Sequence, residues 1–208
     1  MKIGLTEIII LHDNNAPIPD FGKQARKSSS DFISILKKTG FDIRVTFANF
    51  GNGYKVTAND VPVAAVSFNA KNYIANGTRD IFDSAGNMIN EKGKVFSETD
   101  PNEHPENIIF VLTAFGRDNA SKSFTFAQIA DMIGHQSYVY KWKFFCLATE
   151  PAVPQQLGIP EDCVIWMDTT HLNLPPAAEA SASGEAENFL SQALKELAEK
   201  IKKIISGE

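Results

Sequence analysis

The chain has 208 residues, a net charge of −5 at pH 7 and a 43% share of hydrophobic residues, including 15 Phe. This length suits one α/β domain with a large core, and the scattered Lys and Arg residues argue against a nucleic-acid-binding surface. Because no apolar run approaches the roughly 20 residues of a transmembrane helix and no signal-peptide pattern follows Met1, the sequence predicts a protein with no membrane partner. We expect it to be cytoplasmic, or to be assembled into a particle after cytoplasmic synthesis.

Strand and helix patterns alternate along the first third of the chain. Residues 6–13 form an almost continuous apolar run that ends on an aspartate, as in a central parallel strand covered on both faces. Residues 21–36 carry a helical stripe of apolar positions. Residues 42–50 alternate as a strand, and residues 54–66 predict a hairpin around residues 58–60.

The middle of the chain predicts a helix, a loop and a strand. Residues 81–90 predict a short helix, with Asp80 and Asp83 near its positive end, where carboxylates are favoured. Residues 91–106 are polar, contain two prolines and predict a surface loop. Residues 107–114 form the second strongly buried strand.

The remaining elements complete an α/β pattern. Thr125 and Gln128 form a capping box, which opens a helix that runs to about residue 138. Residues 142–148 and 163–166 predict two further short strands. Strands that alternate with helices indicate an α/β fold with a doubly wound, mostly parallel central sheet flanked by helices, and such sheets bind ligands at the C-terminal ends of their strands.

The chain divides into three parts. Residues 1–174 are expected to form the α/β core, residues 175–184 a flexible linker rich in Ala, Ser and Pro, and residues 185–208 a C-terminal helix, the last of the same domain. The apolar residues of this helix fit either docking on the sheet or a coiled-coil seam for self-association. Cys146 and Cys163 lack the paired spacing of a zinc site and are expected to be buried free thiols.

Motifs for catalysis or nucleotide binding are missing from the sequence. No Gly-x-Ser-x-Gly elbow is present, and the Gly-Asn-Gly of residues 51–53 is a turn because no helix with Lys-Ser or Lys-Thr follows it. Of the four histidines, only His12 lies near the predicted ligand-binding end of the sheet. We therefore expect no enzyme, and a small hydrolase or nucleotide-binding protein is the least favoured alternative.

Several segments, in order and spacing, carry a family resemblance. They are residues 5–13, the Asn76-Gly77-Thr78 turn before Ile81-Phe82-Asp83, residues 107–115 followed by Gly116, Asp118-Asn119-Ala120-Ser121, Thr125-Phe126, Gln128-Ile129 and residues 141–145. Over residues 3–205 the chain resembles a von Willebrand factor type A domain of the compact kind found in bacteria and their phages. The resemblance implies a doubly wound fold and a cation site that binds a carboxylate of a protein partner.

The resemblance also shows how far the metal site has changed. The family's site has the form Asp-x-Ser-x-Ser, completed by a Thr and an Asp from two other loops. In this chain the first Asp is Asp13, the two serines fall on Asn15 and Pro17, the Thr is Thr78, and the last Asp falls on Phe115. Because Mg²⁺ needs charge-dense oxygen ligands, a degenerate site is predicted, and no cofactor is expected.

The sequence thus favours a non-enzymatic protein–protein interaction or assembly module that has lost its metal site. The alternative is a divalent-cation-dependent module that binds Mg²⁺ or Mn²⁺ through Asp13, Asn15 and Thr78. Asp13 can equally accept N–H bonds from the following loop, and Phe115 either fills the core or anchors a partner. The candidate partner contacts are Phe115, Asn14, Pro17 and Gly77.

Overall fold

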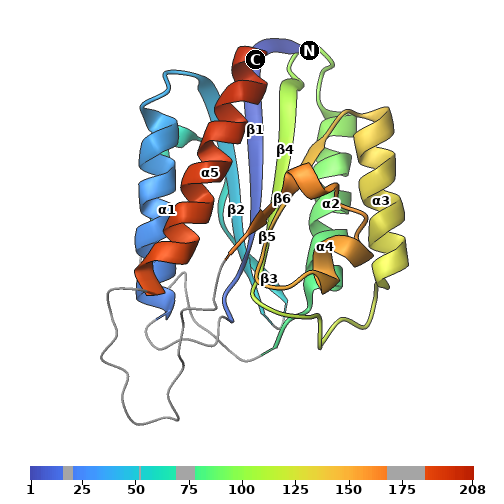
Figure 1. Ribbon diagram of the computed structural model, residues 1–208. Coiled ribbons are helices and arrows are strands. Elements are labelled where there is room, and N and C mark those ends of the chain that lie inside the picture. The colour runs from blue at the N-terminus through green and yellow to red at the C-terminus, as the bar shows by residue number, and fades with distance from the viewer. Residues whose placement is uncertain (16–20, 52, 69–77, 168–185) are drawn as a thin grey trace.

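A six-stranded sheet forms the centre of the molecule (Figure 1). The computed structural model describes residues 1–15, 21–51, 53–68, 78–167 and 186–208. The strands are β1 (Lys2–Asp13), β2 (Asp42–Phe50), β3 (Tyr54–Pro62), β4 (Pro105–Ala114), β5 (Lys143–Ala148) and β6 (Val164–Trp166). Their order is β3-β2-β1-β4-β5-β6, and every neighbouring pair is parallel except β2 and β3. This confirms the predicted doubly wound, mostly parallel sheet flanked by helices.

Helices cover both faces of this sheet. α1 (Phe21–Lys37) and α5 (Ala186–Ser206) lie on one face, while α2 (Ile81–Glu98), α3 (Phe126–Val139) and the short α4 (Ala152–Gln156) lie on the other (Figure 1). Two 3₁₀ turns, η1 (Val63–Ala65) and η3 (Glu161–Cys163), complete the described elements. Each face has its own apolar cluster, because side chains along each central strand point alternately to the two faces. α1, which connects β1 to β2, and α2, which precedes β4, lie on opposite faces, so the switch point of the sheet lies between β1 and β4.

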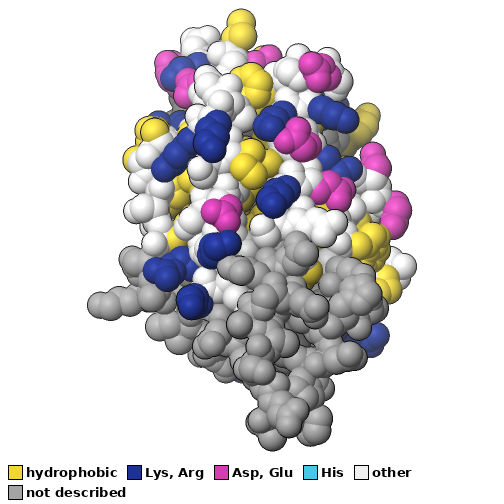
Figure 2. All heavy atoms as spheres, turned by 60° about the vertical axis from the view of Figure 1, so that its left-hand side comes forward, with side chains coloured by type: hydrophobic (Ala, Val, Ile, Leu, Met, Phe, Trp, Pro, Cys, Tyr) yellow, Lys and Arg dark blue, Asp and Glu magenta, His cyan; other side chains and the backbone are white. Residues whose placement is uncertain are grey.

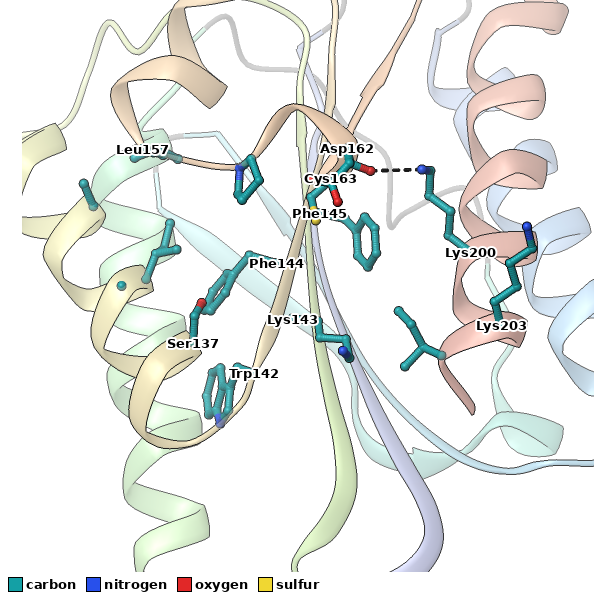
Figure 3. A pocket seen from close by; sticks show the side chains of 16 residues that line it. Ser137, Trp142, Lys143, Phe144, Phe145, Leu157, Asp162, Cys163, Lys200 and Lys203 are labelled. Carbon is teal, nitrogen blue, oxygen red and sulfur yellow. Dashed lines mark hydrogen bonds between the residues drawn. The ribbon is translucent and has the colours of Figure 1, made fainter. Parts of the chain in front are cut away.

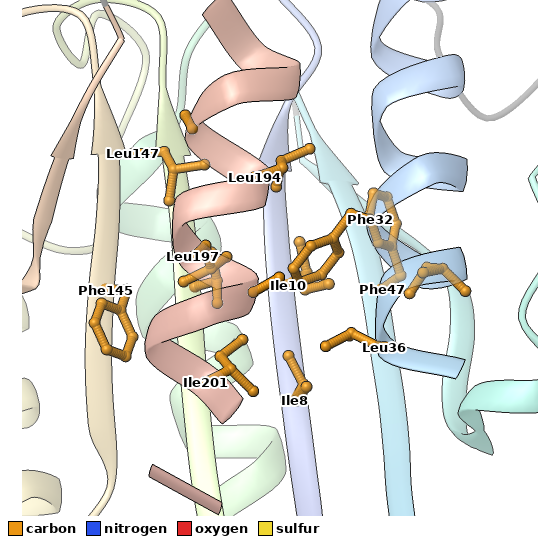
Figure 4. Packing of buried hydrophobic residues seen from close by; sticks show 14 of the residues in the cluster. Ile8, Ile10, Phe32, Leu36, Phe47, Phe145, Leu147, Leu194, Leu197 and Ile201 are labelled. Carbon is orange, nitrogen blue, oxygen red and sulfur yellow. The ribbon is translucent and has the colours of Figure 1, made fainter. Parts of the chain in front are cut away.

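The C-terminal helix α5 packs on the sheet and against α1. Leu194, Leu197 and Ile201 are buried, and Figure 4 shows them over Ile8 and Ile10 of β1. Each fully buried side chain of this size stabilises the fold by about 1.5–3 kcal/mol. The stripe that could have formed a coiled-coil seam is therefore occupied within the domain. The predicted linker, residues 175–184, lies outside the described residues.

Two predicted elements of the first half were wrong. α2 runs to Glu98, so the first half of the predicted loop of residues 91–106 is helix, and the last two residues of that loop begin β4. The helical stripe was obscured because Lys92, a polar residue, occupies a buried position on it. β3 is one strand paired with β2, and the predicted hairpin at residues 58–60 is an irregularity within it, where Asp60 has φ 49°.

A buried ion pair explains the position of Lys92. Its Nζ lies 3.1 Å from Glu7 Oε1 on β1, and the Thr46 hydroxyl donates to the same oxygen at 2.7 Å. Burial raises the pKa of Glu7, although the Lys92 ammonium acts in the opposite direction. Removal of one partner from such a pair leaves an uncompensated buried charge. The pair thus ties the second half of α2 to β1 of the sheet.

Two smaller expectations also have outcomes. The capping box of α3 is present, with Thr125 and Gln128 each accepting from the backbone of the other. Both cysteines are free thiols; Cys146 is buried and Cys163 is half-buried. Among the described residues, no helix is long and apolar enough to cross a membrane.

Two glycines of α2 provide a matched test of how this helix packs against α3 and the loop that precedes it. A Cβ added at Gly86 would lie 2.8 Å from the ring of Phe124 and 2.9 Å from Ile129 Cδ1, whereas the nearest atom at Gly93 is 3.6 Å away, on Gln136. Alanine raises helix propensity by about 1 kcal/mol at either position. We predict that urea unfolding shows Gly93→Ala to be stabilised by about 0.5–1 kcal/mol and Gly86→Ala to be destabilised by about 1–3 kcal/mol. Equal effects of both substitutions would contradict this packing.

Candidate functional site

The C-terminal edge of the sheet at the switch point holds the first predicted site residue, Asp13. Its carboxylate is fully buried at the end of β1. Oδ1 accepts from the backbone N–H of Asn15 at 2.8 Å, and Oδ2 accepts from the N–H of Phe115 at 3.0 Å. The prediction that Asp13 accepts N–H bonds from the following loop is thus confirmed. Phe115 adds a second bond, from the loop after β4, so Asp13 links the two strands of the switch point.

The positive charge beside the Asp13 carboxylate is the guanidinium of Arg79, a side chain of the protein itself. Arg79, in the segment before α2, donates from Nε to Asp13 Oδ2 at 3.1 Å, and its Nη2 donates to the carbonyl of Asn15. The Arg79 side chain is only 17% exposed. Burial raises the pKa of Asp13, opposed by the N–H bonds from Phe115 and Asn15 and by the Arg79 guanidinium. The charge of a buried carboxylate is costly unless it is paired and hydrogen-bonded, and Arg79 supplies that pairing.

Gly116 makes room for the guanidinium. It has φ +153°, and a Cβ added there would lie 3.3 Å from both Cζ and Nη1 of Arg79. The backbone of Arg79 is also fixed, because its N–H donates to Asn119 Oδ1 at 2.7 Å and its carbonyl accepts from the N–H groups of Asn119 and Ala120. The β4–α3 loop therefore positions Arg79 on both its backbone and its side chain.

The structure brings the three predicted metal-ligand residues together, and hydrogen bonds already occupy the Asp13 carboxylate and the Asn15 amide nitrogen. The side-chain amide of Asn15 donates from Nδ2 to the carbonyl of Thr78 at 2.6 Å, while both oxygens of Asp13 accept hydrogen bonds. A divalent cation beside Asp13 would also lie next to the Arg79 guanidinium, which repels it. In the part of the chain that the structure describes, no three His, Cys, Asp or Glu side chains converge as metal ligands. This set of residues does not fit the oxygen-rich, near-octahedral shell that Mg²⁺ requires.

Of the candidate partner contacts, the two described ones are buried. Phe115 is 5% exposed and packs edge-on against Phe189 of α5 and against His12, so the core-filling alternative holds and the exposed-anchor alternative is wrong. Its backbone N–H turns to Asp13 while its ring faces the α5 side of the core. Asn14 is buried at the end of β1, with its N–H bonded to the carbonyl of Phe50. Pro17 and Gly77 lie outside the described residues.

Two further aspartates fasten the β4–α3 loop to the start of α2. Asp83 accepts from the backbone N–H groups of Lys122, Ser123 and Phe124, each at 2.8 Å. Burial acts to raise its pKa, but these bonds hold the pKa below its ordinary value. Asp118 accepts from the N–H of Phe82 at 3.2 Å. Asp83 lies in the first turn of α2, as expected, and its carboxylate also binds the loop.

Sequence reasoning missed Arg79. A signal was available, because a buried Asp that has lost its metal ligands still needs a positive charge, and Arg79 directly follows Thr78 in one of the three loops that meet at this edge. Arg117 in the β4–α3 loop was an equally plausible choice from sequence. In the structure Arg117 pairs with Glu150 and its side chain is largely exposed.

His12 does not form a proton-transfer site. It is buried between Phe47 and Phe115, and burial lowers its pKa to about 3. Thr113 Oγ1 accepts from the N–H of Asp13 at 2.7 Å and lies within hydrogen-bond distance of Nδ1 of His12, 3.2 Å away. His12 is therefore a neutral part of the core directly behind the ion pair.

Comparisons with known proteins agree with this fold. No family model matches the chain, and no curated protein matches it. Among solved structures, two of proximal thread matrix protein 1 (PTMP1) from the mussel byssus are similar. One has a TM-score of 0.60 and 11% identity over 98% of this chain and 46% of that chain. The other, crystal form 2, has a TM-score of 0.61 and 13% identity over 95% and 48%. PTMP1 has a von Willebrand factor type A fold, and at such identities the similarity shows the fold alone. This chain spans about half the length of those it matches.

The burial of His12 predicts a specific pH dependence. A histidine whose pKa is lowered on folding stabilises the native state above its unfolded pKa of about 6.5, and this contribution is lost as the pH falls toward about 3. We predict that His12 accounts for about 2 kcal/mol of the stability lost between pH 8 and pH 5, measured by urea unfolding. His12→Gln should flatten the pH curve by that amount, while His135→Gln, at an exposed site on α3, should not. Parallel curves for the wild type and His12→Gln would contradict the assignment.

Proposed function

We propose that this chain is a non-enzymatic protein-interaction or assembly module that works without a metal ion. The observation that carries the proposal is the Arg79 guanidinium on Asp13, at the switch point where doubly wound sheets bind their ligands. In a cation-dependent module the metal is left open for the partner's carboxylate. Here the positive charge is part of the chain and is already shared between Asp13 and the carbonyl of Asn15.

Further observations support a non-enzymatic role. Among the described histidines, His12 lies nearest this edge; it is buried and neutral, so it cannot exchange protons with a substrate. The similar fold of PTMP1, a matrix protein by name, is compatible with a structural role. We also propose a cytoplasmic location, because Cys146 and Cys163 are both free thiols, as is usual in a reducing compartment.

The surface we assign to the partner is the β4–α3 loop around Arg117. Asp83 and Asp118 hold this loop to α2 through four backbone N–H groups, so it is ordered before binding. Pre-ordered loops lose less conformational entropy on association. The side chain of Arg117 is 77% exposed, and arginine is enriched at protein interfaces. We assign partner contact to this loop because Phe115 and Asn14 are buried and cannot reach a partner.

The metal-free mechanism has a direct thermal test. A cation at 100 times its dissociation constant would add about 2.7 kcal/mol, which for a domain of this size is a shift of about 5–10 °C. We predict that the melting temperature in EDTA and in millimolar Mg²⁺, Mn²⁺ or Ca²⁺ agrees to within about 1 °C, because Arg79 already neutralises Asp13. A shift of several degrees with one cation, abolished in Asp13→Asn, would establish the cation-dependent alternative instead.

The interaction role is tested by cross-linking the purified chain in extract of its native cells and identifying the captured proteins. We predict a partner whose capture is unchanged in EDTA, is lost with Arg117→Glu, and is kept with Lys94→Glu. Lys94 is a matched control, because its exposed side chain lies on the C-terminal half of α2, away from the loop. Capture that is equal for both variants, or that requires a divalent cation, would refute the proposal.

A further inference from the structure

A groove of about 560 Å³ lies beside β5 (Figure 3), toward the opposite edge of the sheet from β3, and neither Asp13 nor Arg79 lines it. Its floor is the first half of β5, one wall comes from α3 and the other from α5. The lining residues that matter below are Gly134, Trp142, Lys143, Phe144, Lys200 and Lys203. All of them lie in the described part of the chain.

The floor of the groove is an open stretch of sheet edge. β6 pairs with only the second half of β5, starting where Val164 lies opposite Cys146. Ala148 accepts from the N–H of Met167 on the β6 side, and backbone groups of alternate residues in a parallel strand point to the same side. Phe144 therefore directs its N–H and C=O into the groove. In the described residues, no backbone hydrogen bond from η3 or β6 reaches them.

An open edge of this kind is a template for one more strand. The residues of η3, just before β6, do not extend the pairing with β5, because the N–H of Cys163 bonds to the carbonyl of Pro160 and not to β5. Lys200 Nζ donates to the carbonyl of Asp162 at 2.9 Å, which fastens α5 to η3 across the end of the groove (Figure 3). An added strand would thus continue the line of β6 along β5.

The two walls differ in chemistry, and this defines the strand that fits. Trp142 and Phe144 belong to the apolar cluster on the α3 side. Lys143 points to the other face, where Lys200 and Lys203 of α5 also line the groove. Asp162 is the one acidic residue among the lining residues, so the α5 wall is positive. Because side chains of a strand alternate between faces, the matching sequence alternates apolar and acidic residues.

Exposed aromatic residues border the groove. The turn between Ser137 of α3 and Trp142 carries Tyr138, which is 81% exposed, and Tyr140, also exposed. Lys141 Nζ lies 5.3 Å from the centre of the Tyr138 ring. Tyrosine is enriched in protein interfaces, where its ring contributes apolar area and its hydroxyl a hydrogen bond. Figure 2, which brings the left-hand side of Figure 1 forward, shows Lys and Arg side chains interspersed with acidic and hydrophobic ones.

We propose that this groove binds an extended segment of a protein partner, with alternating apolar and acidic residues, by strand addition to β5. The backbone of the segment bonds to Phe144, its apolar side chains lie on the α3 wall, and its carboxylates meet Lys143, Lys200 and Lys203. The site is separate from the Arg117 loop, so either surface can be lost while the other still binds.

The test uses the whole protein and a capped eight-residue peptide that alternates Val and Glu. Binding is measured by fluorescence anisotropy, and its location by alkylation of Cys163, which lines the groove; the fully buried Cys146 is the internal control. The peptide should bind and slow alkylation of Cys163. The same peptide with Lys in place of Glu, and the Glu peptide with all of its backbone nitrogens methylated, should do neither.

Two variants and a control locate the site. Gly134→Leu fills the groove from α3 and should abolish binding; it is tolerated because nothing lies within 4 Å of a Cβ at Gly134 and leucine favours a helix more than glycine does. Lys203→Glu should weaken binding about tenfold, a typical effect of reversing an interfacial charge. Lys195→Glu, at an exposed position of α5 outside the groove, should have little effect.

The opposite results would overturn the proposal. They are no binding of the Glu peptide at millimolar concentration, equal binding of the Lys or N-methylated peptide, or unchanged binding by Gly134→Leu. Protection of Cys163 by laurate but not by the peptide would likewise overturn it, because a fatty acid has the charge and the apolar chain but no strand backbone to pair with Phe144.

Discussion

The ion pair between Asp13 and Arg79 is the interaction on which the functional end of this molecule depends. β1 carries a carboxylate into a fully buried position, and a charge there is tolerated only with a partner and several hydrogen bonds. Two backbone N–H groups and one guanidinium meet this need, from the loop after β1, the loop after β4 and the segment before α2. Three separate stretches of chain are thus held at one point, and the charge that an external cation would bring is already present.

The rest of the structure positions this point. The sheet buries apolar side chains on both faces, so β1 and β4 lie in the rigid centre and their ends are fixed relative to each other. The buried pair of Glu7 and Lys92 sets the position of α2 along the sheet, and α2 in turn carries Asp83, which orders the β4–α3 loop. The two proposed binding surfaces are a preformed loop at one edge of the sheet and an open strand at another, which suits a module that joins other proteins together.

Much of the fold could be predicted from the sequence because its signals are local. The apolar runs of β1 and β4, the capping box of α3 and the alternation of strands with helices each depend on neighbouring residues. The length of α2 could not be predicted, since the stripe contains Lys92, whose burial depends on a glutamate 85 positions away. In the candidate site, too, the features set by local sequence could be predicted and those set by long-range contacts could not. Asp13 and its loop bonds were predictable from a strand end, whereas the choice of Arg79 over Arg117, and the inward direction of Phe115, depend on how distant loops meet.

The most direct measurement is a double-mutant cycle on the ion pair, with Asp13→Asn, Arg79→Met and the combined variant compared by urea unfolding. If Arg79 compensates the buried carboxylate, Arg79→Met alone should cost about 3–5 kcal/mol, because it leaves Asp13 charged and unpaired. The combined variant should then recover part of that loss, with a coupling energy of about 2–3 kcal/mol. Effects that add to within about 0.5 kcal/mol would show that the two residues act independently and would contradict the account.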